Sequence, residues 1–86
     1  DYFMSKEKVD LSHDLDVDSI IDNIRKKYSY EKTSSVDGLK IDFADSWVQL
    51  RKSNTEPIIR VYSEAKTQKN ADELSTIFIE EIKNFS

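Results

Sequence analysis

Three segments in the middle of the chain alternate apolar residues with polar or small ones at a period of two. They span residues 39–44, 47–51 and 58–64. Successive side chains of a strand point to opposite sides of a sheet, so each segment predicts a strand with one face toward the core. Gly38 precedes the first segment and Pro57 the last; they are the only glycine and the only proline. Glycine permits the positive φ of a turn, and proline favours an extended residue before it, so both mark connections between strands. The last two segments are expected to pair as a hairpin.

Two further segments repeat apolar residues at the three- and four-residue spacing of a helix. The first follows a run of candidate capping residues at 14–19, and the second follows Asn70, which forms with Glu73 an arrangement close to a capping box. The expected apolar faces are Val17, Ile20, Ile21, Ile24 and Tyr28 in the first helix, and Ala71, Leu74, Phe78, Ile82 and Phe85 in the second. Ile79 is expected on the polar side. Residues 2–11 predict an opening strand, so the expected order is strand, helix, three strands, helix.

The composition is that of a small globular protein. At 86 residues the chain has room for one domain with a two-layer core, and we expect residues 1–86 to form a single domain. Its 37% of hydrophobic residues is too high for a disordered tail, and no segment approaches the roughly 18 apolar residues of a membrane span. The net charge of −4 argues against nucleic acid or an anionic membrane as a partner, since both are bound through many lysines and arginines. A single phosphate needs only a few local charges.

The chain has no cysteine, which excludes a disulfide framework and a thiolate metal site. This is compatible with a reducing compartment, and we expect a cytoplasmic location. The chain starts at Asp1 without the pattern of a signal peptide, and we expect it to be a piece of a longer protein. His13 is the only histidine and is expected to be an ordinary surface residue.

The connection between the last two expected strands carries the clearest chemistry. Its sequence is Arg51-Lys52-Ser53-Asn54-Thr55-Glu56-Pro57. Ser53, Asn54 and Thr55 supply hydroxyl and amide donors in succession, and an arginine can grip two oxygens of one phosphate. In a hairpin, Arg51 enters the loop and Arg60 leaves it, so their side chains are expected to approach a common point. The loop therefore predicts an oxyanion site.

Two alternatives use the same residues. Serine, asparagine, threonine and proline are ordinary turn residues, and the two arginines could pair with Glu56, Asp45 or Glu64 instead of a ligand. The chain could also be a non-enzymatic module, in which the loop binds a phosphopeptide or another phosphorylated partner and the open face of the sheet gives specificity.

The ordered string Arg51-x-Ser53-Asn54-Thr55-Glu56-Pro57-x-x-Arg60 resembles the phosphate-binding loop of one enzyme family. That family is the α-D-phosphohexomutases, the phosphoglucomutases and phosphomannomutases, and the similarity is to their C-terminal domain. The matching stretches are Asp37-Gly38-Leu39-Lys40, Asp45-Ser46-Trp47 and Arg60-Val61-Tyr62-Ser63-Glu64-Ala65. The resemblance covers residues 36–85, and the first third of the chain only loosely.

The resemblance implies an α+β fold of the TATA-binding-protein-like type, with a four-stranded antiparallel sheet and two helices on one face, in the order β-α-β-β-β-α. The residues that it implies for binding the substrate phosphate are Arg51, Ser53, Asn54, Thr55 and Arg60. Lys52 is expected to point to solvent. Glu56 is expected to orient an arginine, since a carboxylate aimed at phosphate would repel it.

Members of this family interconvert hexose 1-phosphate and hexose 6-phosphate through a phosphoserine, a bisphosphate intermediate and a magnesium ion. By resemblance, the present chain would clamp the phosphate that is not reacting and so position the reacting hydroxyl. The serine loop, the magnesium loop and the sugar-selecting loop belong to earlier domains of the family. We therefore expect no catalytic residue, cofactor or metal site in this chain, which alone should be inactive, and Mg²⁺ elsewhere in the full-length enzyme.

The expected partners are a hexose phosphate and the preceding domains of the same chain. The sugar stays open among glucose, mannose and glucosamine, and the resemblance favours a phosphoglucomutase or phosphomannomutase, with a phosphoglucosamine mutase close behind. Asp14, Asp16 and Asp18 are expected to be acids at the start of a helix rather than metal ligands.

Overall fold

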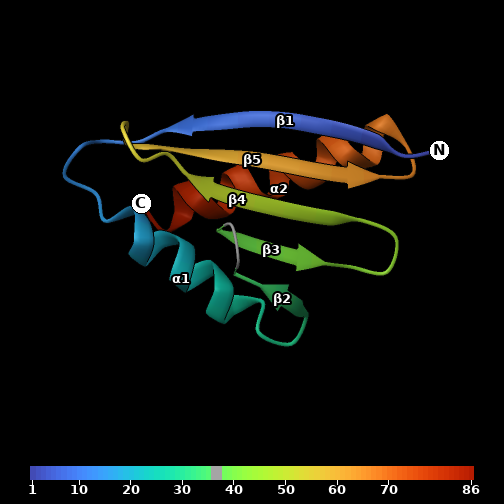
Figure 1. Cartoon of the computed structure of the whole chain (residues 1–86), viewed down its shortest axis with the longest axis horizontal. Helices are drawn as coiled ribbons and strands as arrows, with labels where there is room; N and C mark the ends of the chain where they lie inside the picture. The colour runs from blue at the N-terminus through green and yellow to red at the C-terminus, as the bar shows by residue number, and fades with distance from the viewer. Residues whose placement is uncertain (36–37) are drawn as a thin grey trace.

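The computed structural model describes residues 1–35 and 38–86, which form one antiparallel sheet with two helices packed on one face (Figure 1). The elements are β1 (Phe3–Asp10), α1 (Val17–Lys27), β2 (Lys32–Ser34), β3 (Leu39–Asp42), β4 (Trp47–Lys52), β5 (Ile58–Ala65) and α2 (Gln68–Asn84). The strand order is β1-β5-β4-β3-β2. The expected α+β class is confirmed, and the first strand lies beside the last.

The sheet has five strands instead of the four expected. The additional strand, β2, has three residues and pairs with β3 at the edge of the sheet. Its residues are polar and only Thr33 is partly buried, so no alternation of apolar residues could reveal it. The turn expected at residues 37–38 lies partly outside the described residues, but Gly38 has the positive φ, of 88°, that a turn there requires.

The expected hairpin is confirmed, because β4 pairs antiparallel with β5. Val48 and Leu50 of β4 lie opposite Ser63 and Val61 of β5, and all four are completely buried against the helices. The alternate residues of both strands therefore point to the face of the sheet that carries no helix.

The boundaries and buried face of α2 correct two expectations. The helix begins at Gln68, where the Thr67 side chain accepts a hydrogen bond from Asn70 N at 3.0 Å, so Thr67 is the N-cap and Asn70 lies in the first turn. Ser75 belongs to the buried face because its hydroxyl bonds to that of Ser63 at 2.8 Å. That shifts the face toward Ile79, which packs partly on the core rather than pointing away from it.

A buried carboxylate joins the two helices. Glu81 of α2 accepts hydrogen bonds from Lys27 Nζ at 2.7 Å and from the Tyr28 hydroxyl at 2.6 Å. Burial, the largest single influence, raises the pKa of Glu81, but the hydrogen bonds from Lys27 and Tyr28 and the charge of Lys27 together outweigh it, so the pKa lies below its usual value. Burial and the same hydrogen bond raise the pKa of Tyr28.

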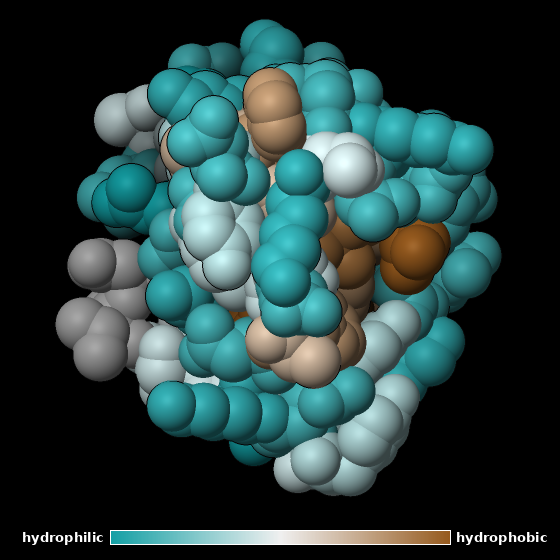
Figure 2. All heavy atoms as spheres, turned by 90° about the vertical axis from the view of Figure 1, so that its right-hand side faces the viewer, coloured by the Kyte–Doolittle hydropathy of each residue, from teal (hydrophilic) through white to brown (hydrophobic). Residues whose placement is uncertain are grey.

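The end of the sheet at which the chain starts is mostly hydrophilic, and apolar residues show there in a few small areas between polar ones (Figure 2). Tyr2, Phe3, Met4 and Ile77 keep large exposed fractions, between 42% and 57%. In the described part of the chain, neither helix is long and apolar enough to cross a membrane.

Candidate anion-binding site

The loop between β4 and β5 is held by main-chain hydrogen bonds at both sides. Ser53 N donates to Ile58 O at 3.2 Å, and Ile58 N donates to Glu56 O at 2.8 Å, which closes a tight turn around Pro57. The Pro57 carbonyl accepts from Leu11 N at 2.7 Å. The loop is therefore fixed to its own hairpin and to the end of β1.

The hydroxyl of Ser53 organises the tip of the loop. Its oxygen accepts from Thr55 N and from Glu56 N, each at 3.3 Å, and lies 3.5 Å from Thr55 Oγ1. A serine that accepts main-chain hydrogen bonds in this way stabilises a local turn. Because two donors already point at the oxygen, the hydroxyl hydrogen is the part of Ser53 best placed to donate to a ligand.

The hairpin register places the two arginines directly opposite each other. Arg51 of β4 pairs with Arg60 of β5, and both side chains are exposed. Residues in this relation point to the same side of the sheet with Cβ atoms about 5 Å apart. Arg51 shares this helix-free side with Trp47 and Gln49, as the alternation of β4 predicts. The structure thus gives two guanidinium groups that can reach the same anion.

Two of the three carboxylates proposed as alternative partners for the arginines are engaged elsewhere. Glu64 accepts from Trp47 Nε1 at 3.1 Å, and Asp45 forms an ion pair with Lys66 at 3.1 Å. In residues 1–35 and 38–86, no ion pair joins Arg51 or Arg60 to an acid, and Glu56 makes none with either arginine. The arginines keep their charges available for an anionic ligand.

Lys52 is exposed, as expected, and it also has a partner that the sequence does not predict. Its Nζ lies 3.0 and 3.1 Å from the two carboxylate oxygens of Asp18 in α1. Because alternation turns Lys52 away from the side of Arg51, the two neighbouring cations have different surroundings. Nothing in the sequence could reveal the pair, because its members are 34 residues apart and each is an ordinary surface charge.

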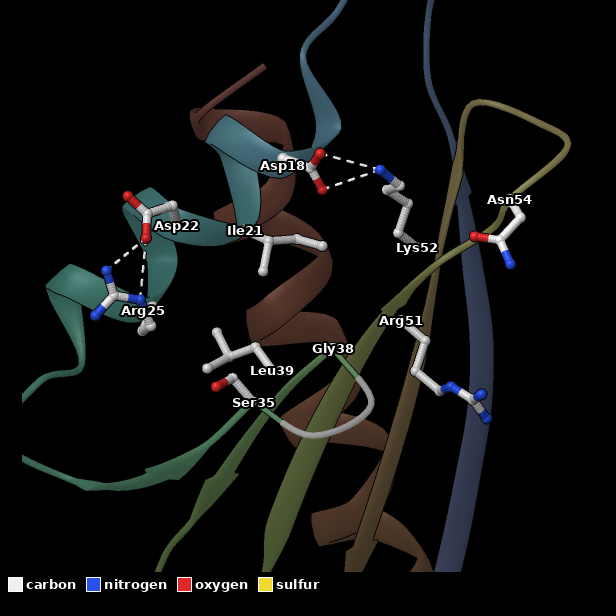
Figure 3. Close-up of a pocket in the computed structure, with 10 residues that line it drawn as sticks. All are labelled: Asp18, Ile21, Asp22, Arg25, Ser35, Gly38, Leu39, Arg51, Lys52 and Asn54. Carbon is white, nitrogen blue, oxygen red and sulfur yellow. Dashed lines mark hydrogen bonds and ion pairs between the residues drawn. The ribbon is translucent and has the colours of Figure 1, made fainter.

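The expected site residues line two separate hollows. Arg51 and Asn54 border a hollow of about 470 Å³ whose other walls include Asp18, Asp22 and Ser35. Of these residues, Arg51 points its side chain away from α1, and Asn54 lies on the loop between β4 and β5 (Figure 3). Arg60 borders a second hollow, of about 270 Å³, on the helix-free face. Of the expected site residues, the hydroxyls of Ser53 and Thr55 lie close to each other, and Arg51 lies opposite Arg60. Asn54 is exposed at the tip of the loop.

Gly38 supports the strand that carries Arg51. A Cβ atom at Gly38 would lie 2.2 Å from the carbonyl oxygen of Leu50 and 3.2 Å from Cα of Arg51. Only a residue without a side chain permits this approach together with a positive φ. The glycine recognised as a turn residue is therefore also a packing residue of the site.

The acids that precede and open α1 have structural partners. Asp16 is the N-cap and accepts from Ser19 N at 3.1 Å, Asp14 accepts from the Ser12 hydroxyl, and Asp18 binds Lys52. Among the residues described, no group of three or more histidine, cysteine, aspartate or glutamate side chains is arranged to hold a metal ion.

Comparison with known proteins agrees with the loop string. Residues 6–81 match the family model described as phosphoglucomutase/phosphomannomutase, C-terminal domain. The chain is 44% identical over 75 residues to a phosphoglucosamine/phosphogalactosamine mutase of Sulfurisphaera tokodaii, covering 85% of this chain and 16% of that protein. It is 36% identical over 76 residues to a probable phosphoglucosamine mutase of Pyrococcus horikoshii, covering 85% of this chain and 17% of that protein.

A solved structure shares the fold. It is a phosphoglucomutase/phosphomannomutase family protein of Burkholderia thailandensis, with a TM-score of 0.67 and 20% identity over 99% of this chain and 18% of that one. The present chain thus spans a small part of the length of the relatives it matches. On the match over residues 6–81, the chain belongs to the family of phosphoglucomutase/phosphomannomutase C-terminal domains.

Proposed function

We propose that this chain is the C-terminal domain of a phosphohexomutase, and that its β4–β5 loop clamps the substrate phosphate while hexose 1-phosphate and hexose 6-phosphate are interconverted. The observation that carries the proposal is the cross-strand pair of Arg51 and Arg60, which has no carboxylate partner in the described residues and stands beside the loop of Ser53. Family membership supports a mutase over a phosphopeptide-binding module.

Each loop residue has a role in this proposal. Arg51 and Arg60 neutralise the phosphate and donate charge-assisted hydrogen bonds, while the Ser53 and Thr55 hydroxyls and the Asn54 amide fix its orientation. Holding the remote phosphate presents the reacting hydroxyl in line with the phosphoryl donor, so binding energy lowers the chemical barrier. The donor serine and the magnesium ion would belong to preceding domains of the same cytoplasmic chain.

The names of the relatives bear on the sugar. Phosphoglucosamine mutases are prominent among the similar proteins, together with a phosphoglucomutase/phosphomannomutase of Thermococcus kodakarensis that is 55% identical over 42 residues, 49% of this chain and 9% of that protein. A clamp that grips only the phosphate suits all these substrates. We therefore propose that this chain binds the phosphate group of a hexose phosphate or hexosamine phosphate, and that it does not select the sugar.

A titration of the isotopically labelled 86-residue chain tests the clamp. Glucose 6-phosphate and glucosamine 6-phosphate should both shift the amide signals of residues 51–60, with dissociation constants on the order of 1 mM, and glucose should not. Arg51→Ala should abolish the shifts while the spectrum stays that of a folded chain. Shifts confined to residues distant from this loop would contradict the proposal.

A further inference from the structure

The helix-free face of the sheet carries three basic residues from three adjacent strands in one line. Lys8 of β1 is directly opposite Arg60 of β5, and Arg60 is directly opposite Arg51 of β4. The three strands lie side by side at the end of the sheet that bears the loop (Figure 1). We call Lys8, Arg60 and Arg51 the cationic row.

The cationic row places like charges directly opposite each other, and no acid in the described part of the chain neutralises them. Like charges directly opposite each other on a sheet destabilise it. In the described residues, none of the three side chains forms an ion pair. Two acids lie near the row. Glu7 borders the same hollow as Lys8 and Arg60, and Asp10 lies on β1 opposite Ile58, two residues beyond Lys8. Neither acid forms an ion pair with the row. An arrangement that weakens the fold and lacks an internal partner indicates an external anion.

Lys8 is placed to take part in binding that anion. It lines the hollow of about 270 Å³ together with Lys6, Arg60 and Tyr62. Arg60 stands between Lys8 and Arg51, so a phosphate above Arg60 is within reach of long side chains from both neighbouring strands. The main-chain bond from Leu11 N to Pro57 O holds the end of β1 against the loop.

We propose that Lys8 is a third cationic ligand of the phosphate monoester bound by Arg51 and Arg60, so that β1 completes the site from outside the β4–β5 loop. This rests on the proposed clamp. Lysine contributes a point charge with three donors, which complements the planar forks of the two arginines. Lys6 is a matched neighbour, because it lies on the same strand and face but opposite Tyr62.

Binding of inorganic phosphate to the 86-residue chain, followed by amide shifts of residues 51–60, tests this inference. Lys8→Ala should raise the dissociation constant about fivefold, the effect of removing one unit charge at about 4 Å in water. Lys6→Ala should change it less than about twofold, because that charge lies farther from the anion. Lys8→Arg should retain most of the affinity, because it keeps a cation at the same position.

The variants separate the two proposals. If Lys8→Ala and Lys6→Ala weaken binding equally, or Lys8→Ala has no effect while Arg51→Ala abolishes binding, the role of Lys8 is wrong and the clamp stands. If Arg51→Ala also leaves phosphate binding unchanged, or the unaltered chain binds none, both are wrong. Thermal unfolding of each variant shows that a loss of binding is not a loss of fold.

Discussion

Charged side chains are treated in opposite ways at two places in this molecule. Between the helices, Glu81 is 5% exposed and receives hydrogen bonds from both Lys27 and Tyr28. On the helix-free face, Arg51 and Arg60 are exposed, directly opposed and free of ion pairs within the described chain. The first arrangement satisfies a buried charge, while the second leaves charge unsatisfied at the surface.

The difference separates a charge that the fold itself must satisfy from two charges that stay available for the proposed ligand. A buried carboxylate without partners would cost several kcal/mol, so Lys27 and Tyr28 are needed whatever the protein binds. Two arginines directly opposite each other add nothing to the stability of the fold. The hairpin places both of them on its solvent-exposed face, where a ligand could reach them. Substitutions at the two places should therefore have separable effects, on stability at one and on binding at the other.

The largest effect is expected from Arg51→Ala in a complete mutase chain that contains this domain. Loss of a charge-assisted, two-pronged grip should lower kcat/KM at least about 100-fold, since hydrogen bonds to charged groups contribute about 1.5–3 kcal/mol each. Lys52→Ala is the control, because the neighbouring cation pairs with Asp18. Steady-state kinetics with hexose phosphate measure both, and equal losses in the two variants would show that the site is not centred on Arg51.

Glu81→Ala is expected to lower the free energy of unfolding by about 2 kcal/mol, because Tyr28 loses its acceptor in a partly buried position and Lys27 its counter-ion. Phosphate binding by the folded variant should not change. Glu80→Ala, at the exposed neighbouring position, should stay within about 0.5 kcal/mol. Urea unfolding measures both values. A loss of phosphate affinity in folded Glu81→Ala would remove the separation between the two regions.

The dependence of stability on pH gives a smaller effect at the same contact. The pKa of Glu81 is lowered in the folded chain from its usual value of 4.5, so its contribution is present above that pH and is lost as the pH falls through the folded pKa. Glu81→Gln should therefore lose less stability than the unaltered chain between about pH 6 and about pH 3. Asp14 and Asp22, whose pKa values are also lowered, are common to both proteins and cancel in the difference. Urea midpoints at the two pH values measure it, and equal losses would mean that Glu81 is not stabilised as a carboxylate.

The parts of the fold that the sequence predicts are those with local, periodic signals. The alternation of β3, β4 and β5 and the spacing in α1 and α2 identify those elements, and the loop string identifies the family. The polar strand β2 has no such signal, and Ser75 looks like a solvent-facing serine until its contact with Ser63 is known. What the sequence cannot supply is chiefly pairing between distant segments.

The same limit applies to the candidate site. Arg51 and Arg60 are close in sequence and joined by a recognisable loop, so their pairing across the hairpin is predictable. Lys8 is separated from Arg60 by more than half of the chain, and only the β1–β5 register brings them together. In the sequence, Lys8 is one of several charges in the opening strand, with no feature that distinguishes it from Lys6.

The smallest expected effect bears most directly on whether the charges of the helix-free face oppose folding. Arg60→Gln removes the middle charge of the cationic row and keeps a long polar side chain. It should raise the unfolding temperature by about 2–4 °C, which corresponds to about 0.5 kcal/mol of relieved repulsion. Lys6→Gln, opposite Tyr62, should have no comparable effect. The gain should shrink in high salt, which screens exposed charges, and in the presence of phosphate, which should stabilise the unaltered chain more than Arg60→Gln. Calorimetry at low and high ionic strength measures these differences. A fall in unfolding temperature on Arg60→Gln would mean that the charge of Arg60 stabilises the folded chain, which would contradict the view that it opposes folding and is available for a ligand.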